Sequence, residues 1–225
     1  MSVSTSMNNA AQPPFTRERL SMVEQQLRRR GIHDERILAA MNRVPRHEFV
    51  LPQNWPEAYA DHPIAIAEQQ TTSQPYMIAA MLQAAEINPG DRVLEIGSGS
   101  GYQTALLAEL ASQVFAIERY PTLVEQARQV LERLGYKNIT LAAGDGTLGL
   151  PEAAPFNAIV VSAAAPQLPP ALIEQLAVGG RLVIPVGDVS EQVLQLVEKQ
   201  ADGIAVRSLE GCRFVPLIGQ QGFAA

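Results

Sequence analysis

A short glycine-rich stretch does most to limit the folds open to this chain. Residues 93–101 read Val-Leu-Glu-Ile-Gly-Ser-Gly-Ser-Gly, an apolar run that passes directly into three alternating glycines. The apolar run predicts a buried strand, and glycines let the backbone turn tightly and let a ligand approach without meeting a Cβ. From about residue 91 onward, short apolar runs alternate with amphipathic segments. This alternation predicts an α/β fold with a mostly parallel, doubly wound, Rossmann-like sheet.

The order of these runs predicts the individual elements. Strands are expected at residues 92–96, 113–117, 138–142, 157–161 and 181–186. Helices are expected from the glycine turn to residue 111, at 121–134 and at 170–177, the last one stopping at the glycine pair 179–180. Further strands are expected at 192–198, 204–209 and 213–217. Because no helix separates these last strands, we expect an antiparallel element that closes one edge of the sheet.

The first part of the chain is helical in pattern. Thr16 is the expected N-cap of a helix that runs to about residue 30 and stops at Gly31. The expected apolar stripe of this helix is Leu20, Val23 and Leu27. A second helix, expected after Asp34 and before Pro45, carries Ile37, Leu38 and Met41. The arginines at 28–30 are interpreted as cations at a helix end, with a phosphate-binding patch as the alternative.

Length and charge set further bounds. The 225 residues predict a disordered tail at 1–15 and one domain at 16–225, made of a helical appendage with a loop (16–85) and a Rossmann-like core (91–225). With 17 Lys and Arg against 23 Asp and Glu, we expect no nucleic-acid or membrane partner. The single cysteine, Cys212, cannot form an internal disulfide, so we expect a cytoplasmic protein. We expect this thiol to be buried rather than nucleophilic. We also expect the protein to be a monomer. No cluster with metal-ligand spacing is present in the sequence.

The glycine spacing selects among nucleotide-binding turns. A dinucleotide fingerprint starting at Gly97 would need its third glycine at position 102, which is Tyr102. No Gly-Lys-Ser/Thr follows, which excludes a phosphate-binding P-loop. The pattern Glu-x-Gly-x-Gly-x-Gly at 95–101 instead resembles the nucleoside-binding motif of S-adenosylmethionine-dependent methyltransferases. The cofactor-binding residues expected from this motif are Glu95, Gly97, Ser98, Gly99 and Gly101.

Two more carboxylates follow the next two strands. Glu118 stands 21 positions after Gly97, where a carboxylate can accept hydrogen bonds from both ribose hydroxyls. Asp145 lies between two glycines, where it could take an adenine amino group. Each also has a plain interpretation, as an anion at a helix start or as a turn former. The glycine turn, Glu118 and Asp145 stand at three successive strand ends, and together they favour a nucleoside cofactor. Arg119 and Gly146, which stand beside these carboxylates, are expected to bind it as well.

A segment upstream of the first sheet strand narrows the family. Residues 70–77 read Gln-Thr-Thr-Ser-Gln-Pro-Tyr-Met and resemble the signature of the protein-L-isoaspartate O-methyltransferases, Gln-Thr-Ile-Ser-Gln-Pro-Tyr-Met. Similar pieces occur at 44–50, 154–159, 179–187 and 213–217, so the resemblance covers about residues 16–219. It implies an S-adenosylmethionine-dependent methyltransferase fold and S-adenosylhomocysteine as the product. It also implies methylation of the free carboxylate of L-isoaspartyl, and less well D-aspartyl, residues in damaged proteins, whose ester collapses to a succinimide and so starts repair.

The resemblance implies Ser73 as the catalytic residue, and Thr72, Ser73, Arg213 and Val215 as substrate-binding residues. The alternative for Ser73 is a cap on the helix that begins near Pro75. A carboxylate acceptor is already ionised at pH 7, so no general base is needed. The three histidines are therefore expected to pack rather than to catalyse; they are His33, His47 and His62.

The chain departs from the family pattern beside the signature. It carries Ala67-Glu68-Gln69 where family members usually have Gly-Gln-Gly, and Thr72 in place of Ile. Residues other than glycine dislike positive φ, so the loop is expected to follow another path. This departure supports a rival hypothesis, a methyltransferase for another carboxylate or a small molecule. A second rival is a catalytically silent nucleoside-binding module.

Overall fold

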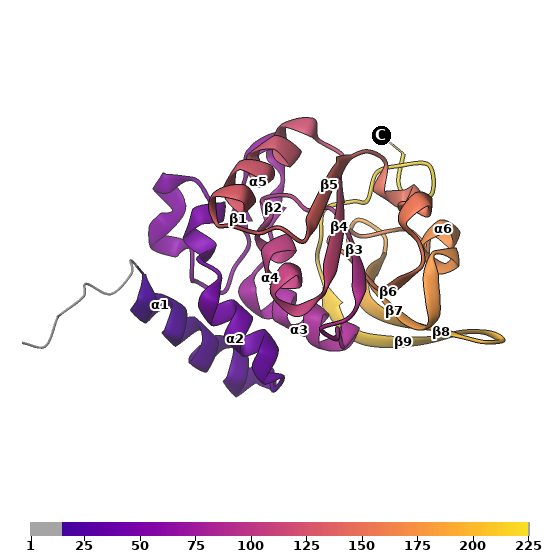
Figure 1. The fold of residues 1–225 in the computed structure, drawn as a ribbon, viewed down its shortest axis with the longest axis horizontal. Coiled ribbons are helices and arrows are strands. Elements are labelled where there is room, and N and C mark those ends of the chain that lie inside the picture. Colours follow the sequence, from indigo (N-terminus) through magenta and orange to yellow (C-terminus); the bar gives the residue numbers. More distant parts are fainter. Residues whose placement is uncertain (1–14, 225) are drawn as a thin grey trace, which may run out of the picture.

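The computed structural model describes residues 15–224, and the tail expected at 1–15 lies outside this range apart from Phe15. A seven-stranded sheet forms the centre, in the order β5-β4-β3-β6-β7-β8-β9 (Figure 1). Its parallel strands are β3 (Arg92–Ile96), β4 (Gln113–Glu118), β5 (Ile139–Ala143), β6 (Phe156–Val161) and β7 (Leu176–Gly187). The strands β8 (Gln192–Gln200) and β9 (Gly203–Cys212) pair antiparallel and close one edge. The predicted fold class is confirmed.

Helices cover both faces of the sheet. The helices α3 (Pro75–Ala85), α4 (Tyr102–Leu110) and α5 (Pro121–Arg133) share one apolar core with β-strand residues such as Val93. The next residue of β3, Leu94, belongs to a second core together with α6 (Pro170–Glu174). Successive strand residues point to opposite faces, so both layers are built from the same buried strands.

The topology fixes where a ligand can bind. The central strand β3 pairs with β4 on one side and β6 on the other, both parallel, and the chain order reverses direction at this point. Ligands of open α/β sheets bind at such a switch point, beyond the carboxyl ends of the strands. The segment that precedes α3 also lies near this edge, as a two-stranded sheet of β1 (Ile64–Ala65) and β2 (Thr71–Thr72).

The N-terminal helix differs from its prediction in helix type, in its N-cap residue and in one residue of its buried face. It consists of α1 (Thr16–Ser21), a π-helical segment at 22–27 and a 3₁₀ turn at 28–30, and it stops at Gly31 with φ 94°. Phe15, not Thr16, occupies the N-cap. The predicted stripe is wrong at Leu20, which is 50% exposed, and is confirmed at Val23 and Leu27, which are buried; Met22, at the start of the π-helical segment, is buried as well.

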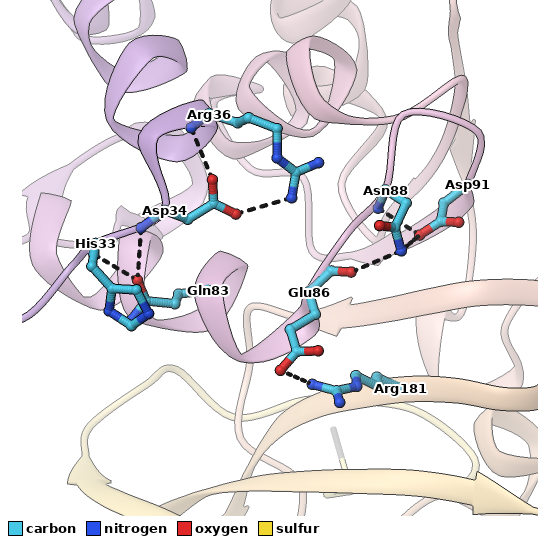
Figure 2. Close-up of polar contacts among 8 residues, drawn as sticks. All are labelled: His33, Asp34, Arg36, Gln83, Glu86, Asn88, Asp91 and Arg181. Carbon is cyan, nitrogen blue, oxygen red and sulfur yellow. Dashed lines mark hydrogen bonds and ion pairs between the residues drawn. The ribbon is translucent and has the colours of Figure 1, made fainter.

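This appendage is fastened to α3, as Figure 2 shows. The Gln83 side chain accepts hydrogen bonds from the backbone N–H of His33 (2.8 Å) and of Asp34 (3.3 Å). The helix α2 (Glu35–Arg43) begins directly after Asp34, as predicted, and the Asp34 side chain caps it. At the same C-terminal end of α3, its C-cap residue Glu86 forms an ion pair with Arg181 of β7, 2.6 Å apart. This end of the helix is therefore held both by the appendage and by the sheet.

Two sequence-based predictions of secondary structure are wrong. Helix α6 ends at Glu174, and the glycine pair lies inside β7 at a register shift, where a Cβ on Gly180 would stand 2.8 Å from the Ala177 carbonyl oxygen. Residues 213–217 form no strand. They run beside the loop after β6, where Val215 and Leu217 exchange backbone hydrogen bonds with Ala164 (2.8 and 2.7 Å). This pairing places them at the carboxyl edge of the sheet.

Candidate active site

A cavity of about 350 Å³ opens at the carboxyl ends of β3 and β4, and we call it the glycine-turn cavity. Its walls come from the glycine turn, the end of β4, Gly146 after β5, and two loop segments, 68–71 and 215–218. Such a volume lies in the range of small-molecule sites, which begins at about 300 Å³. Of the predicted cofactor residues, the cavity brings together Gly97, Gly99, Glu118, Arg119 and Gly146.

Glu118 is tied to the glycine turn. Its carboxylate accepts hydrogen bonds from the backbone N–H of Gly99 (2.9 Å) and of Tyr120 (3.0 Å), and only 6% of the residue is exposed. Gly97 and Gly99 have φ of 83° and 51°, which favour glycine. A carboxylate has about four acceptor sites, so two remain toward the cavity. That capacity matches the two hydroxyls of a ribose.

The structure places Asp145 away from the cavity that it was predicted to serve. Its carboxylate accepts hydrogen bonds from the Thr147 N–H (2.9 Å), the Thr147 hydroxyl (2.6 Å) and the Gln220 N–H (2.8 Å). Asp145 is not among the residues that line the cavity, whereas the next residue, Gly146, is. A Cβ on Gly146 would stand 2.4 Å from Cγ2 of Ile96. At this position Gly146, and not the Asp145 carboxylate, therefore borders the cavity.

Three other predicted cofactor residues, Glu95, Gly101 and Ser98, do not line the glycine-turn cavity. Glu95 is fully buried and accepts hydrogen bonds from the Thr104 hydroxyl (2.5 Å) and the Gln103 amide (3.1 Å); burial raises its pKa to about 8. A Cβ on Gly101 would stand 3.0 Å from that of Ala127, so this glycine permits close packing on α5. Ser98 is buried, and its hydroxyl has no hydrogen-bond partner within residues 15–224.

A second cavity, of about 270 Å³, lies beside α3, and we call it the α3 cavity. It contains Ser73, Arg213 and Val215, three of the four predicted substrate residues. Val215 lines both cavities, as do Thr71 and Ser162, so the two spaces share a wall. Two ligands, one in each cavity, would therefore meet at this wall.

The Ser73 side chain is available for such a ligand. The N-cap of α3 is Gln74, so the alternative role of Ser73 as the helix cap is not what the structure shows. Its backbone carbonyl accepts a hydrogen bond from the Arg46 guanidinium (2.8 Å). Within the described part of the chain, no hydrogen bond engages the Ser73 hydroxyl.

Thr72, the fourth predicted substrate residue, does not reach the α3 cavity. It is buried, and its hydroxyl accepts a long hydrogen bond from Arg46, 3.4 Å. Arg46 is itself fully buried, donates to the Ala58 carbonyl (2.8 Å) and lies over the Tyr102 ring. Sequence reasoning did not assign Arg46 a role, although it lies within the segment 44–50 that resembles the family. It fixes the backbone that presents Ser73.

Ser162 is a second residue that sequence reasoning missed. It follows β6, donates its N–H to the Ile96 carbonyl (2.8 Å), and its hydroxyl accepts from the Gln103 amide (2.8 Å). Ser162 could have been predicted from its position just after a strand, because ligands of open α/β sheets bind beyond the carboxyl ends of the strands. The histidines stay apart: none lines either cavity, and burial lowers the pKa of His47, which hydrogen-bonds Tyr59 at 2.8 Å.

Cys212 lines the α3 cavity and is half-buried; burial raises its pKa to about 11, as expected of a packed thiol. Within residues 15–224, no group of three His, Cys, Asp or Glu side chains is placed to hold a metal ion. Over the same residues, no helix is both long and apolar enough to span a membrane.

Comparisons with known proteins agree with this geometry. The family described as protein-L-isoaspartate(D-aspartate) O-methyltransferase matches residues 17–222. The chain belongs to this family. It is 55% identical to the protein-L-isoaspartate O-methyltransferase of Koribacter versatilis over 210 residues, 93% of this chain and 95% of that one. Protein-L-isoaspartate O-methyltransferase 1 of Syntrophobacter fumaroxidans is 53% identical over 209 residues, 93% and 98% of the two chains.

Solved structures of the family share the fold. One protein-L-isoaspartate O-methyltransferase superposes with a TM-score of 0.80 at 27% identity, covering 92% of this chain and 67% of that one. A Plasmodium falciparum protein described as a member of the family superposes with a TM-score of 0.77 at 30% identity, covering 89% and 98%. That structure is in complex with S-adenosyl-L-homocysteine.

Proposed function

We propose that this chain carries out the reaction of its family by placing S-adenosylmethionine in the glycine-turn cavity and the L-isoaspartyl residue of a damaged protein in the α3 cavity. The observation that carries the proposal is the wall shared by the two cavities, which is formed by Thr71, Ser162 and Val215. The acceptor is the free carboxylate of the isoaspartyl residue, and D-aspartyl residues are poorer acceptors.

The residues of the glycine-turn cavity suit the cofactor. Glu118 has acceptor capacity left for the ribose hydroxyls, and the backbone at Gly146 suits the flat face of the base. The positive end of α4, which begins at Tyr102, suits the methionine carboxylate. When bound, the cofactor supplies a methyl group on a sulfonium, which passes to a carboxylate oxygen as the carbon–sulfur bond breaks.

The protein's own task is to orient the acceptor. The acceptor carboxylate, with a reference pKa near ~4, is ionised at neutral pH, so no side chain has to remove a proton. Holding an oxygen in line at ~3 Å can lower the barrier by several kcal/mol. The proposed residue for this task is Ser73, because it lines the α3 cavity and its hydroxyl has no hydrogen-bond partner in the described structure.

Replacing Ser73 with alanine tests this role. We expect Ser73→Ala to lower kcat for an isoaspartyl peptide by about 10²-fold while the Kd for S-adenosylhomocysteine stays within about twofold. Ser208→Ala, on β9 and outside both cavities, is the matched control. Full activity of Ser73→Ala would remove this residue from the proposal.

The rival hypothesis of another acceptor loses its main support. Glu68, the added carboxylate that motivated it, lines the glycine-turn cavity and not the α3 cavity. Comparing methyl transfer to an isoaspartyl peptide, its normal aspartyl twin and small acids decides between the two, and any transfer at all excludes a silent module. One unpaired cysteine suits a cytoplasmic setting.

A further inference from the structure

A groove of about 470 Å³ lies between α3 and β9, outside both cavities, and we call it the α3–β9 groove. Its helix wall carries Tyr76, Ala80 and Ala84, which repeat every four residues and therefore share one face of α3. Its strand wall carries Leu209 and Glu210. The two alanines leave the space that larger side chains on this face would fill.

This groove continues the α3 cavity along the same two elements. On the helix, Tyr76 lines the groove and the next residue, Met77, lines the cavity. On the strand, Glu210 lines the groove and the next residue, Gly211, lines the cavity. The two spaces are therefore bordered by adjacent residues on both elements. An extended chain that leaves the cavity along α3 and β9 would enter this groove.

The lining chemistry suits a polypeptide of mixed sequence. Leu209 is 37% exposed, and the Tyr76 ring is held under the Arg30 guanidinium, 3.5 Å from its centroid. Asp61 fixes this pair, because it forms an ion pair with Arg30 and accepts a hydrogen bond from the Tyr76 N–H (3.2 Å). The wall at Tyr76 and Arg30 is therefore preformed, and the apolar part of the lining is Leu209 together with Ala80 and Ala84. Arg207 and Glu210 stand on its rim, and neither has an ion-pair partner in the part of the chain that the structure describes.

We propose that the α3–β9 groove is a flanking subsite that binds the substrate polypeptide a few residues away from the isoaspartyl residue and prefers an apolar side chain there. This rests on the proposed function, because it takes the α3 cavity as the place of the reacting residue. Ala80 and Ala84 follow Ser73 by 7 and 11 positions. At ~1.5 Å per helical residue and ~3.3 Å per extended residue, the groove lies about three to five substrate residues from the reacting carboxylate.

Two isoaspartyl peptides and two variants test the subsite. The short peptide has one residue on each side of the isoaspartyl residue, and the long peptide has five on each side, including leucines. The test variant is Leu209→Asp, and the matched control is Ile204→Asp, on the same strand, outside the groove and similarly exposed (37% and 41%). Ala84→Gln, which fills the groove from the helix side, is a second test variant.

We expect the unaltered protein to bind the long peptide about five- to tenfold more tightly than the short one, by calorimetry and by KM. Leu209→Asp and Ala84→Gln should remove this advantage, whereas Ile204→Asp should keep it. The Kd for S-adenosylhomocysteine and kcat for the short peptide should not change. An advantage that survives Leu209→Asp, or is lost equally in Ile204→Asp, overturns the subsite.

Failure of the proposed function would show differently, as an absence of methyl transfer to the short peptide by the unaltered protein. Calorimetry with the long and short peptides does not depend on turnover. It therefore still decides whether the groove binds the flanking residues. Loss of the length advantage in Leu209→Asp and Ala84→Gln but not in Ile204→Asp supports the subsite, and any other pattern overturns it.

Discussion

The hydroxyl of Thr122 donates a hydrogen bond to the carboxylate of Glu68, with 2.6 Å between Oγ1 and Oε1. Thr122 lies in the first turn of α5, and Glu68 belongs to the loop segment that lines the glycine-turn cavity. A carboxylate near a helix N-terminus is also favoured by the helix dipole. Glu68, which departs from the family pattern, therefore ties the loop to α5 beside the glycine-turn cavity.

Removing the donor should loosen that loop. We expect Thr122→Val to weaken S-adenosylhomocysteine binding about three- to tenfold, which corresponds to one charge-assisted hydrogen bond of about 1 kcal/mol, mainly through faster dissociation. Calorimetry gives the Kd, and stopped-flow displacement gives the off-rate. Thr140→Val, on β5 and away from the cavity, is the control. An unchanged Kd and off-rate would show that the contact plays no part in holding the cofactor.

The same loop contains backbone strain that glycine would relieve. Glu68 and Gln69 both have φ 57°, a left-handed conformation that costs a side-chain-bearing residue about 1–2 kcal/mol. Glycine loses more entropy on folding, so the net gain from Gln69→Gly should be up to about 1 kcal/mol, or a Tm higher by about 2–4 °C. The next residue, Gln70, has φ −92°, and Gln70→Gly should lower the Tm instead. Equal shifts in the two variants would contradict the strain argument.

Local patterns were enough to predict much of this fold. The apolar runs that became β3, β4 and β6 are buried on both faces, so each run stands out from its neighbours in the sequence. Their parallel order then brings Gly97, Glu118 and Ser162 to one edge. The glycine turn and Glu118 could be predicted because short local segments indicate both the residue types and their positions at strand ends.

Other outcomes depend on partners that are distant in the sequence. Asp145 was expected to face a ligand, but it binds the backbone of Gln220, 75 positions away. Thr72 was expected at the substrate, but a buried arginine 26 positions earlier takes its hydroxyl. Residues 213–217 have a strand-like pattern, yet their backbone-to-backbone hydrogen bonds go to residues in loops, Ala164 and Phe223. A sequence pattern does not show which polar group a side chain will meet.

Glu118 offers a direct test of the ribose-binding site. We expect Glu118→Ala to weaken S-adenosylhomocysteine binding by at least about 30-fold, because it removes an anchored carboxylate, and to lower the free energy of unfolding by about 1–3 kcal/mol, because two backbone N–H groups lose their acceptor. Calorimetry and urea unfolding measure the two effects. Glu125→Ala, an exposed carboxylate on α5, is the control and should change neither. Cofactor affinity within threefold of the unaltered protein would exclude Glu118 from the site.

The buried carboxyl of Glu95 should give the protein a distinct pH dependence. Burial raises its pKa from 4.5 to about 8, although the hydrogen bonds from Thr104 and Gln103 act in the opposite direction. An unfolded chain releases this proton near its ordinary pKa, so the folded state holds one more proton between about pH 4.5 and 8. Stability from this group is therefore lost as the pH rises through that window, by up to ~1.4 kcal/mol per pH unit, and levels off above it.

Glu95→Gln removes the ionisation while keeping the shape of the side chain. We expect the unfolding free energy of Glu95→Gln, relative to the unaltered protein, to rise from pH 5 to pH 8 and then to stay constant. Urea unfolding at one-unit intervals from pH 5 to 9 measures this difference, in which the contributions of the other carboxylates cancel. Glu125→Gln serves as the control for the loss of a carboxylate at an exposed position. A difference that does not change with pH would mean that Glu95 is ionised in the folded protein and that Thr104 and Gln103 suffice to stabilise its charge.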